Sequence, residues 1–382
     1  MNDRTGAGPA TAGASAAGAT ATGSSAGAGA GDGGTPTTTG PSSSGTSGSS
    51  AAPKRRRIRI PEKFFALQSY VALLLVFVAA IAFSPRRGGE IVFLGSDNLL
   101  NIVRATSEIG IIAIGMTFVI LIGGIDLSVG SVLGMSATGV ASLLMVNQMG
   151  VVPAVLIILA LATTFGALQG TITATFGIQA FIVTLAGLQI ARGIARIWSG
   201  GQGIPIAYGE GSGTAPDSFA LLNSRTFNGT VPIPALIFLA VAVIAILVAR
   251  NTVFGRHVYA IGGNERAARL SGVPVRRVKI AVFAIAGMLA GLAGIIQAGQ
   301  LNQGSPNAGI SYELDAIAAV VIGGTSLMGG VGTVAGTVAG ALLIGILKNV
   351  LALNNIDSNI QLLITGFIII VAAGIQTFRA RT

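Results

Sequence analysis

Long apolar runs alternate with short polar segments through most of this chain. Each run has about 20 residues, the length that a helix needs to cross the hydrocarbon core of a bilayer. Between the runs lie glycine, proline and charged residues, which end helices or favour the membrane surface. The pattern predicts ten membrane-spanning helices, near residues 64–83, 105–124, 126–146, 151–171, 179–198, 232–250, 278–299, 313–331, 333–353 and 358–377.

The composition supports this prediction. Hydrophobic residues make up 52% of the chain and charged residues 9%, whereas soluble domains carry about 25% charged residues. The mean hydropathy is +0.78. Cysteine is absent, which excludes disulfides and thiolate metal sites. We therefore expect an all-α, polytopic membrane protein with about ten transmembrane helices.

The first part of the chain differs from the rest. Residues 1–52 are almost entirely glycine, alanine, serine, threonine and proline, which offer too little bulky apolar surface to offset the entropy of ordering. A basic run at 54–59 then precedes the first apolar run, where it can anchor the chain at the inner membrane face. We predict a disordered cytoplasmic tail over residues 1–60 and a membrane domain over residues 61–382.

Basic residues follow the positive-inside rule over most of the chain. An even number of spans puts both termini in the cytoplasm, and 16 of the 23 basic residues then fall on that side. Arg86, Arg87 and Arg104 oppose the rule at the first hairpin. The net charge of +10 does not indicate nucleic-acid binding, because the basic residues cluster at the ends of apolar runs and form no basic face with interleaved aromatics.

A polar segment from Arg250 to Lys279 holds seven basic residues and a single acid, so the positive-inside rule places it in the cytoplasm. Residues 264–271 are typical of one short helix, with an asparagine N-cap at its start and Gly272 followed by Pro274 as its stop signal. We expect this helix to meet a cytoplasmic partner. The candidate contact residues are Asn264, Glu265, Arg266, Ala267, Ala268, Arg269, Leu270 and Gly272.

Two glycine-rich segments, Ile122–Gly134 and Ile322–Gly336, interrupt the apolar runs. Both begin Ile-Gly-Gly, which indicates a faint internal repeat. Transporters often place unwound helix breaks near the substrate path, where irregular backbone lines a cavity. Close helix packing is the alternative, and a four-residue spacing favours it for Gly332, Gly336 and Gly340. The candidate translocation-path residues are Gly123, Gly124, Asp126, Ser128, Gly323 and Gly324.

Four acidic residues fall within or beside the predicted spans, where a charge is costly. Glu108, Glu313 and Asp315 lie near predicted outer helix ends, where capping, the helix dipole or interfacial water can satisfy them. Asp126 lies at the junction of the second and third spans. It either caps the third helix, pairs with an arginine, or takes part in conformational change or in the path.

The chain lacks the residues that several chemistries need. None of its four lysines follows a glycine, so it contains no P-loop for ATP. His257 is the only histidine and lies in the polar segment, which argues against a histidine-based triad or an intramembrane metal site. We therefore expect no catalytic residue, no metal and no cofactor.

Three motifs together resemble the permease subunit of ribose-type ABC sugar importers. They are GMTFVILIGGIDLSVGSVLG at 115–134, GGNERAARLSGV at 262–273 and AAVVIGGTSLMGGVGTVAGTVAG at 318–340, in the family's order. The resemblance covers roughly residues 64–378. It implies a non-catalytic permease in the lipid of the inner (plasma) membrane. Its implied partners are a second permease copy, ATPase subunits that use the ATP, and an extracytoplasmic solute-binding protein.

The resemblance also implies a role for residues 264–272. They are similar to the coupling element of ABC importers, in which Glu-Ala-Ala is followed four residues later by glycine. Ala267, Ala268 and Gly272 match, whereas Arg266 separates Glu265 from the alanines. The short helix is therefore expected to contact the ATPase. The hydrophilic segment 199–231 becomes the main external loop and a candidate docking surface for an extracytoplasmic protein.

The expected cargo is a monosaccharide such as ribose or xylose. Related permeases import branched-chain amino acids or nucleosides, and these cargoes remain alternatives. A proton-coupled secondary transporter, in which Asp126 or Glu108 carries the proton, is the alternative from another class. Such a transporter works alone, whereas a permease needs its partners.

Overall fold

The computed structural model describes residues 62–209, 211, 213–226 and 229–381. The predicted disordered tail and its basic anchor, residues 1–60, lie outside these ranges. Within them, helices account for most of the structure, and the strands are only two residues long.

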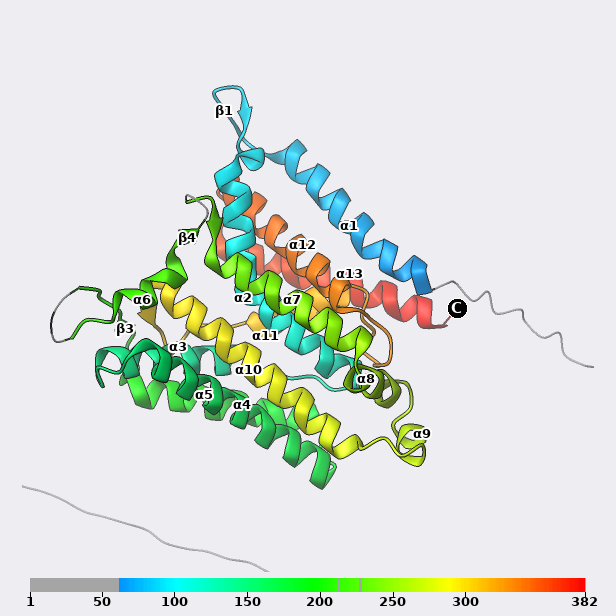
Figure 1. Ribbon diagram of the computed structural model, residues 1–382. Coiled ribbons are helices and arrows are strands. Elements are labelled where there is room, and N and C mark those ends of the chain that lie inside the picture. The colour runs from blue at the N-terminus through cyan, green and yellow to red at the C-terminus, as the bar shows by residue number, and fades with distance from the viewer. Residues whose placement is uncertain (1–61, 210, 212, 227–228, 382) are drawn as a thin grey trace, which may run out of the picture. The chain divides into compact units, whose positions relative to one another are not determined.

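A helix overlaps each of the ten predicted spans, which confirms the all-α polytopic fold (Figure 1). In the described part of the chain, α2, α4, α5, α7, α10 and α12 are long and apolar enough to cross a membrane. The ten helices are α1 (Glu62–Phe83), α2 (Ser96–Leu121), α3 (Val129–Met145), α4 (Val151–Phe176), α5 (Ala180–Ser199), α7 (Ile233–Asn251), α10 (Val275–Leu301), α11 (Tyr312–Ile322), α12 (Val334–Leu353) and α13 (Ser358–Arg381).

Helix α11 corrects one of the predicted spans. The predicted span 313–331 is an 11-residue helix followed by irregular backbone up to residue 333. At about 1.5 Å per residue, such a helix covers about half of the hydrocarbon core. The irregular part contains Gly324, Gly329 and Gly330, which have φ angles of 86°, 85° and 74°. These angles lie in the left-handed region and are incompatible with a continuing right-handed helix.

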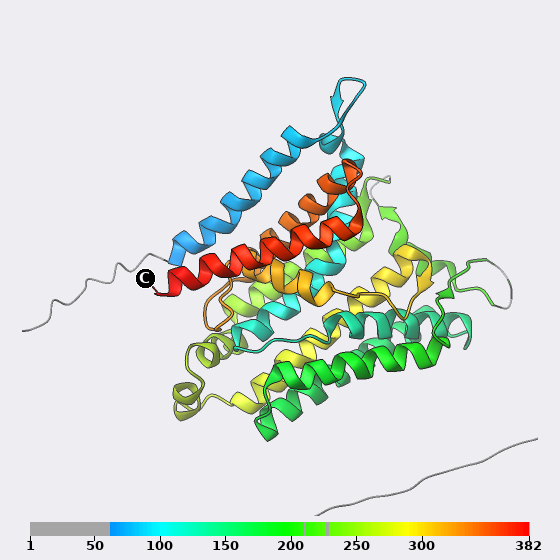
Figure 2. The same cartoon turned by 180° about the vertical axis from the view of Figure 1, so that it is seen from behind.

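The short elements lie at the two ends of the long helices. Helices α8 (Val253–Gly263) and α9 (Glu265–Leu270) lie at the same end as the start of α1 and the last turn of α13 (Figures 1 and 2). We call this the α8–α9 end. The opposite, hairpin end carries α6 (Asp217–Ala220), η1 (Val92–Leu94), η2 (Leu221–Asn223) and the strands β1 (Arg86–Arg87), β2 (Glu90–Ile91), β3 (Ile204–Pro205), β4 (Arg225–Thr226), β5 (Val231–Pro232) and β6 (Gln303–Gly304).

The strands form three antiparallel pairs at the hairpin end. Strand β1 pairs with β2, β3 with β6, and β4 with β5. The β3–β6 pair joins the loop after α5 to the loop after α10, with Ile204 opposite Gly304. The β1–β2 hairpin carries Arg86 and Arg87 at the end opposite α8 and α9, so the structure keeps the predicted first hairpin despite its basic residues (Figure 1).

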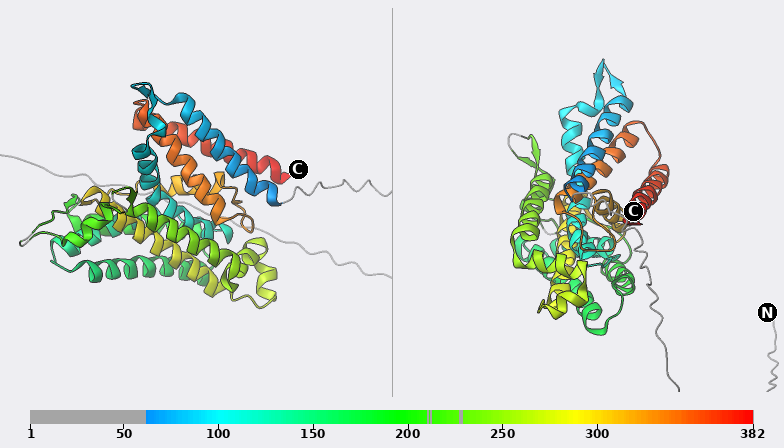
Figure 3. Two further views of the ribbon diagram at one scale, coloured as in Figure 1. Left: turned by 45° about the horizontal axis from the view of Figure 1, so that its top comes forward. Right: turned by 90° about the vertical axis from the view of Figure 1, so that its right-hand side faces the viewer.

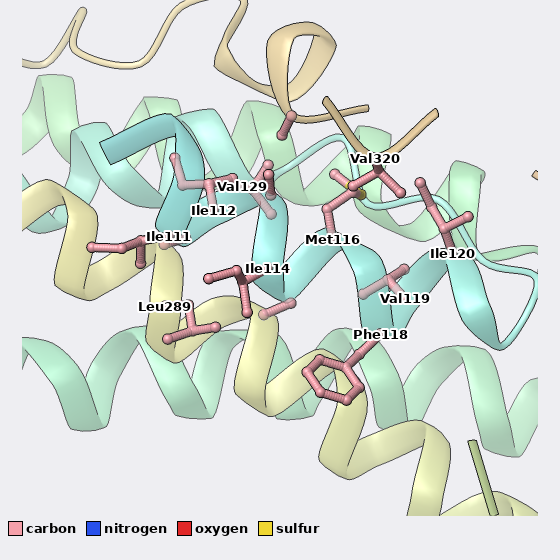
Figure 4. Packing of buried hydrophobic residues seen from close by; sticks show 14 of the residues in the cluster. Ile111, Ile112, Ile114, Met116, Phe118, Val119, Ile120, Val129, Leu289 and Val320 are labelled. Carbon is pink, nitrogen blue, oxygen red and sulfur yellow. The ribbon is translucent and has the colours of Figure 1, made fainter. Parts of the chain in front are cut away.

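Helix α2 forms the centre of the packed core. Every residue from Thr106 to Leu121 is buried, and a helix that is buried all round is surrounded by other helices rather than by lipid or water. Figure 4 shows Phe118 pointing toward α10 and Met116 pointing toward Val320 of α11. Figure 3 shows α1, α12 and α13 on one side of α2, and α4, α5 and α10 on the other.

Helices α4 and α10 approach each other backbone to backbone. A Cβ atom at Gly166 would overlap the carbonyl oxygen of Phe283, and one at Gly287 would overlap the carbonyl oxygen of Ala162. Small residues at both positions let the helix axes come close, which supplies van der Waals contact where lipid offers no hydrophobic driving force.

The packing prediction for the later glycines is right for two of three positions. A Cβ atom at Gly336 would overlap the carbonyl oxygen of Gly323, and one at Gly340 would overlap that of Ala319, so both bring α12 against α11. Gly332 lies instead in the irregular segment with a φ angle of 149°. Helix packing is therefore the wrong interpretation for Gly332.

Candidate functional site

The first glycine-rich segment is a true break between α2 and α3. Helix α2 ends at Leu121 and α3 begins at Val129. Between them, Gly123 has a φ angle of 77°, a left-handed conformation that glycine adopts without steric cost. Helix α3 therefore begins three residues later than the predicted third span, 126–146, because the break occupies the first residues of that span.

Asp126 stabilises the start of α3 from within the break. Its side chain is 1% exposed. One carboxylate oxygen accepts the backbone N–H of Ser128 at 2.8 Å and the Ser128 hydroxyl at 2.6 Å. Among the described residues no cation forms an ion pair with Asp126. Asp126 therefore forms a turn before α3 and does not cap it, because the N-cap residue of α3 is Ser128 and no side-chain cap hydrogen bond is present there. The arginine-pair interpretation does not fit the geometry either.

Side chains of α4 and α5 hold this break in place. Gln169 of α4 donates a hydrogen bond from Nε2 to the Ser128 hydroxyl oxygen at 3.0 Å. On α5, the Thr184 hydroxyl oxygen accepts the backbone N–H of Leu127 at 3.1 Å. Gly187 of α5 leaves room for Gln169, since a Cβ atom there would lie 2.8 Å from its Nε2. The break is thus a fixed polar structure inside the helical packing.

The second glycine-rich segment folds into a loop between α11 and α12. The Ser326 N–H donates to the carbonyl oxygen of Val331 at 2.8 Å, which closes the loop on itself. Met328 lies at its tip and is 85% exposed. Satisfying backbone groups within the loop is necessary for irregular backbone in a membrane protein.

The two breaks are in direct contact. The N–H of Gly330 donates to the carbonyl oxygen of Leu121 at 2.9 Å. A Cβ atom at Gly329 would lie 2.9 Å from the backbone nitrogen of Gly123. The faint sequence repeat therefore marks two segments that meet in space, although the repeat itself does not predict their contact.

Helix α8 joins the same contact from the α8–α9 end. A Cβ atom at Gly262 would overlap the carbonyl oxygen of Leu121 and the nitrogen of Gly330. The hydroxyl of Tyr259 donates to the carbonyl oxygen of Gly332 at 2.9 Å. Burial raises the pKa of Tyr259, while the nearby Arg250 charge lowers it less, so the phenol stays protonated and able to donate. We call residues 121, 123, 262, 329 and 330 the glycine junction.

The predicted path residues divide between different surroundings. Gly123 lies against the second loop, with a Cβ atom there 3.8 Å from the carbonyl oxygen of Met328, whereas Gly124 packs against Val119 and Ala180. Gly323 packs against α12 rather than against the first break. The structure thus brings the two segments together through residues 328–330 rather than through Gly323, and the role of the six residues in a translocation path stays a prediction.

Helix α9 has the features predicted for the short helix at 264–271. The Asn264 side chain accepts the N–H of Ala267 at 2.9 Å, as an N-cap does. Gly272 ends the helix with a φ angle of 83°. Ala268 is buried at 6% exposure, whereas Leu270 is 83% exposed. An exposed leucine at the end of a basic helix is a candidate contact for a protein partner.

Ion pairs attach α9 to α10. Glu265 accepts hydrogen bonds from Lys279 of α10 at 2.7 Å and from Arg269 at 3.1 Å. Burial raises the pKa of the Glu265 carboxyl, but its hydrogen bonds and charge interactions with Lys279 and Arg269 outweigh burial, so the pKa lies below its ordinary value. The acid that departs from the family pattern therefore fixes α9 on the next spanning helix.

The other buried acids have partners that the sequence did not predict. Helix α2 begins nine residues earlier than predicted, so Glu108 lies halfway along it and not near an outer end. Its carboxylate accepts hydrogen bonds from Gln297 of α10 at 2.9 Å and from the Tyr312 hydroxyl at 3.4 Å. Asp315 of α11 pairs with Lys348 of α12 at 2.6 Å. Long-range packing thus satisfies Glu108 away from any helix end, whereas Asp315 lies in the first turn of α11, as predicted, and forms an ion pair in addition.

Comparison with known proteins gives these features a context. The family described as the permease component of the branched-chain amino acid transport system matches residues 98–373. The ribose import permease protein RbsC of Haemophilus influenzae is 42% identical over 305 residues, 80% of this chain and 91% of that protein. RbsC of Bacillus subtilis is 39% identical over 321 residues, 84% of this chain and 95% of the relative.

The xylose transport system permease protein XylH of Haemophilus influenzae is 35% identical over an alignment of 365 residues, covering 81% of this chain and 96% of the relative. No solved structure matches the chain significantly. The matched residues 98–373 contain both glycine-rich breaks, α8 and α9, so the resemblance that the three motifs predict is confirmed. The chain belongs to the family of membrane permease components of the branched-chain amino acid transport system type.

Proposed function

We propose that this chain is the permease subunit of an ATP-binding-cassette importer and forms the path for a monosaccharide of the ribose or xylose class. The relatives named for ribose and xylose support this class of cargo. The observation that carries the proposal is the glycine junction, which connects the helices of the α8–α9 end to both broken segments.

The partners follow from the placement of exposed groups. An ATPase subunit binds at α9, where Leu270, Arg266 and Arg269 are exposed, and it alone uses ATP. A solute-binding protein docks on the loop between α5 and α7 at the hairpin end, and a second permease copy completes the path. The chain lies in the inner membrane with the α8–α9 end in the cytoplasm, because seven basic residues lie between Arg250 and Lys279. Both termini then face the cytoplasm.

The contacts of α8 and α9 suggest how movement is transmitted. ATP-driven closure of the ATPase displaces α9, and the Glu265 ion pairs pass the displacement to α10. Helix α8 passes it to Leu121 and Gly330 through the contacts of Gly262. Backbone atoms in direct contact cannot absorb the displacement by side-chain rotation. Both breaks therefore shift together. The free energy for this movement comes from the difference in nucleotide affinity between the two conformations of the importer.

Uptake by proteoliposomes tests this function. The chain is reconstituted with and without its ATPase and solute-binding protein, under ATP or an imposed proton gradient, with labelled ribose, xylose, leucine or adenosine outside. We expect pentose uptake that requires ATP and both partners. Uptake of leucine or adenosine without any uptake of pentose would reassign the cargo. Uptake by the chain alone under the gradient would make it a secondary transporter, with Glu108 and Asp126 as the acids to test.

A further inference from the structure

A basic pocket lies beneath α9, apart from the glycine junction. It has a volume of about 320 Å³ and opens between the last turns of α4 and the first turns of α10. Figure 1 shows these three elements together at the α8–α9 end. The pocket is lined by Ala174, Glu265, Arg269, Pro274, Val275, Arg276, Arg277 and Lys279.

The pocket has an unbalanced positive charge. Four of its lining residues are cations and one is a carboxylate. That carboxylate, Glu265, is already engaged by Lys279 and Arg269. Arg276 and Arg277 are exposed and form no ion pair with any described residue. Like charges this close repel one another, and an anionic ligand in the pocket relieves the repulsion.

An apolar strip leads from the pocket along a spanning helix. Arg277 shares one face of α10 with Ala281, Ala284 and Met288, at spacings of four, three and four residues. Ala281 and Ala284 are partly exposed, and Met288 is 38% exposed. Over 11 residues this strip is about 16 Å long. A cation at the helix end, followed by exposed small and apolar side chains at membrane depth, matches a headgroup followed by an acyl chain.

We propose that this pocket binds an anionic phospholipid of the inner leaflet. Its phosphate contacts Arg276 and Arg277, and one acyl chain follows Ala281, Ala284 and Met288. Basic pockets at the cytoplasmic ends of spanning helices suit such headgroups. An acidic protein surface is disfavoured as the occupant because it cannot follow the apolar strip into the membrane. The lipid would brace α9 against α4 and α10 through a pocket that Leu270 does not line.

Lipid retention by the purified full-length chain tests the proposal without ATPase, binding protein or sugar. The chain is extracted with equal amounts of phosphatidylglycerol and phosphatidylcholine, and bound lipid is counted by native mass spectrometry. The variant R276Q/R277Q removes the pocket charges. The variant R250Q/R256Q removes the same charge from two exposed arginines at the same end that do not line the pocket. The variant R276K/R277K keeps the charge and checks that position 276–277 tolerates change.

We expect wild type to retain phosphatidylglycerol over phosphatidylcholine. R276Q/R277Q should weaken that retention by about fivefold per arginine, while R250Q/R256Q and R276K/R277K should retain most of it. An M288D variant should also lose lipid, because a carboxylate interrupts the acyl strip. Equal retention of both lipids, or equal loss in both glutamine variants, would overturn the site.

Two further arms separate lipid from other anions. Excess glycerol 3-phosphate should not displace the lipid, because it lacks the acyl chains, and displacement would identify a site for free phosphate instead. If R276Q/R277Q kept its lipid but failed to bind the ATPase, the pocket would belong to a protein partner. Because the lipid measurement uses the permease alone, its failure would leave the importer function untouched.

Discussion

The backbone N–H of Gly330 donates a hydrogen bond to the carbonyl oxygen of Leu121 at 2.9 Å, so the loop after α11 is tied to the last residue of α2. Leu121 is the point at which α2 ends and the first break begins. Gly262 of α8 lies against both atoms. This hydrogen bond thus joins two helix breaks that are far apart in the sequence. Helix α8 contacts both breaks at the same point.

Adding a methyl group at Gly262 should separate these three elements. In G262A the Cβ would overlap backbone atoms that cannot rotate away, and overpacking of this kind costs about 1–3 kcal/mol. We expect a lower unfolding temperature and reduced ATP-driven uptake. G263A is the matched control, since nothing lies within 4 Å of a Cβ at the neighbouring position. Equal effects of both substitutions would contradict the close contact at Gly262.

Removing the Tyr259 hydroxyl should weaken the link between α8 and the second loop. Y259F deletes the donor to the Gly332 carbonyl oxygen, which costs about 0.5–1.5 kcal/mol. We expect the assembled importer to hydrolyse ATP with less sugar moved per ATP. The control is Y70F on α1, an exposed tyrosine outside the junction. An unchanged ratio of sugar to ATP in Y259F would rule out a coupling role for this hydrogen bond.

Replacing Leu270 should affect partner binding and not folding. The side chain is 83% exposed, so L270D should leave the free energy of unfolding of the isolated permease within about 0.5 kcal/mol of wild type. Binding of the ATPase subunit should weaken at least about tenfold if Leu270 is a central contact. L270M should bind nearly normally. Wild-type affinity in L270D, measured by pull-down titration, would move the ATPase contact away from α9.

Substitutions at Asp126 separate a structural role from proton transport. An asparagine side-chain oxygen can still accept the Ser128 N–H, so D126N should retain folding and ATP-driven uptake. D126A leaves buried donors unpaired and should cost about 1–3 kcal/mol. Thermal unfolding and uptake on the two variants provide the comparison. A well-folded D126N that transports nothing would show that the charge itself is required.

The attachment of α9 to α10 should depend on acid pH. Ion pairs lower the pKa of Glu265 below its ordinary value of 4.5. A carboxyl with a lowered folded-state pKa contributes stability above its ordinary pKa and loses it as pH falls through the folded value. The protection factors of residues 265–270, which compare exchange with that of an unstructured chain at the same pH, should therefore stay high at neutral pH and fall below about pH 4.5. E265Q should exchange fast at neutral pH as well. Protection that is identical in E265Q would show that these ion pairs do not hold α9.

The spans and α9 were predictable because their signals are local. An apolar run of spanning length predicts a helix whatever its neighbours are. Asn264 caps the start of α9 with its side chain, and Gly272 ends α9 through its left-handed backbone conformation. Helix α8 was missed because its residues lie in a segment that was interpreted as a polar loop and include three glycines. Helix α11 was overextended, since the glycine-rich loop after it contains no charged residue to mark the end of the span.

The contacts of the site were not predictable because they join distant residues. Glu108 was placed near an outer helix end because the start of α2 was predicted too late, and its partner Gln297 lies on another helix. Likewise, the partners of Gly262 are backbone atoms, which carry no side-chain signal in the sequence. Only packing shows that a glycine is required by a neighbour rather than by its own conformation.

The backbone contact between Gly166 of α4 and Gly287 of α10 limits which parts of the protein can move. Helices slide past each other when side chains between them can change rotamer, and here no side chain intervenes. Helices α4 and α10 therefore behave as one rigid unit that crosses the membrane. Any cycle of opening and closing has to move α4 and α10 as one unit, so a crosslink between α4 and α10 should leave transport unchanged.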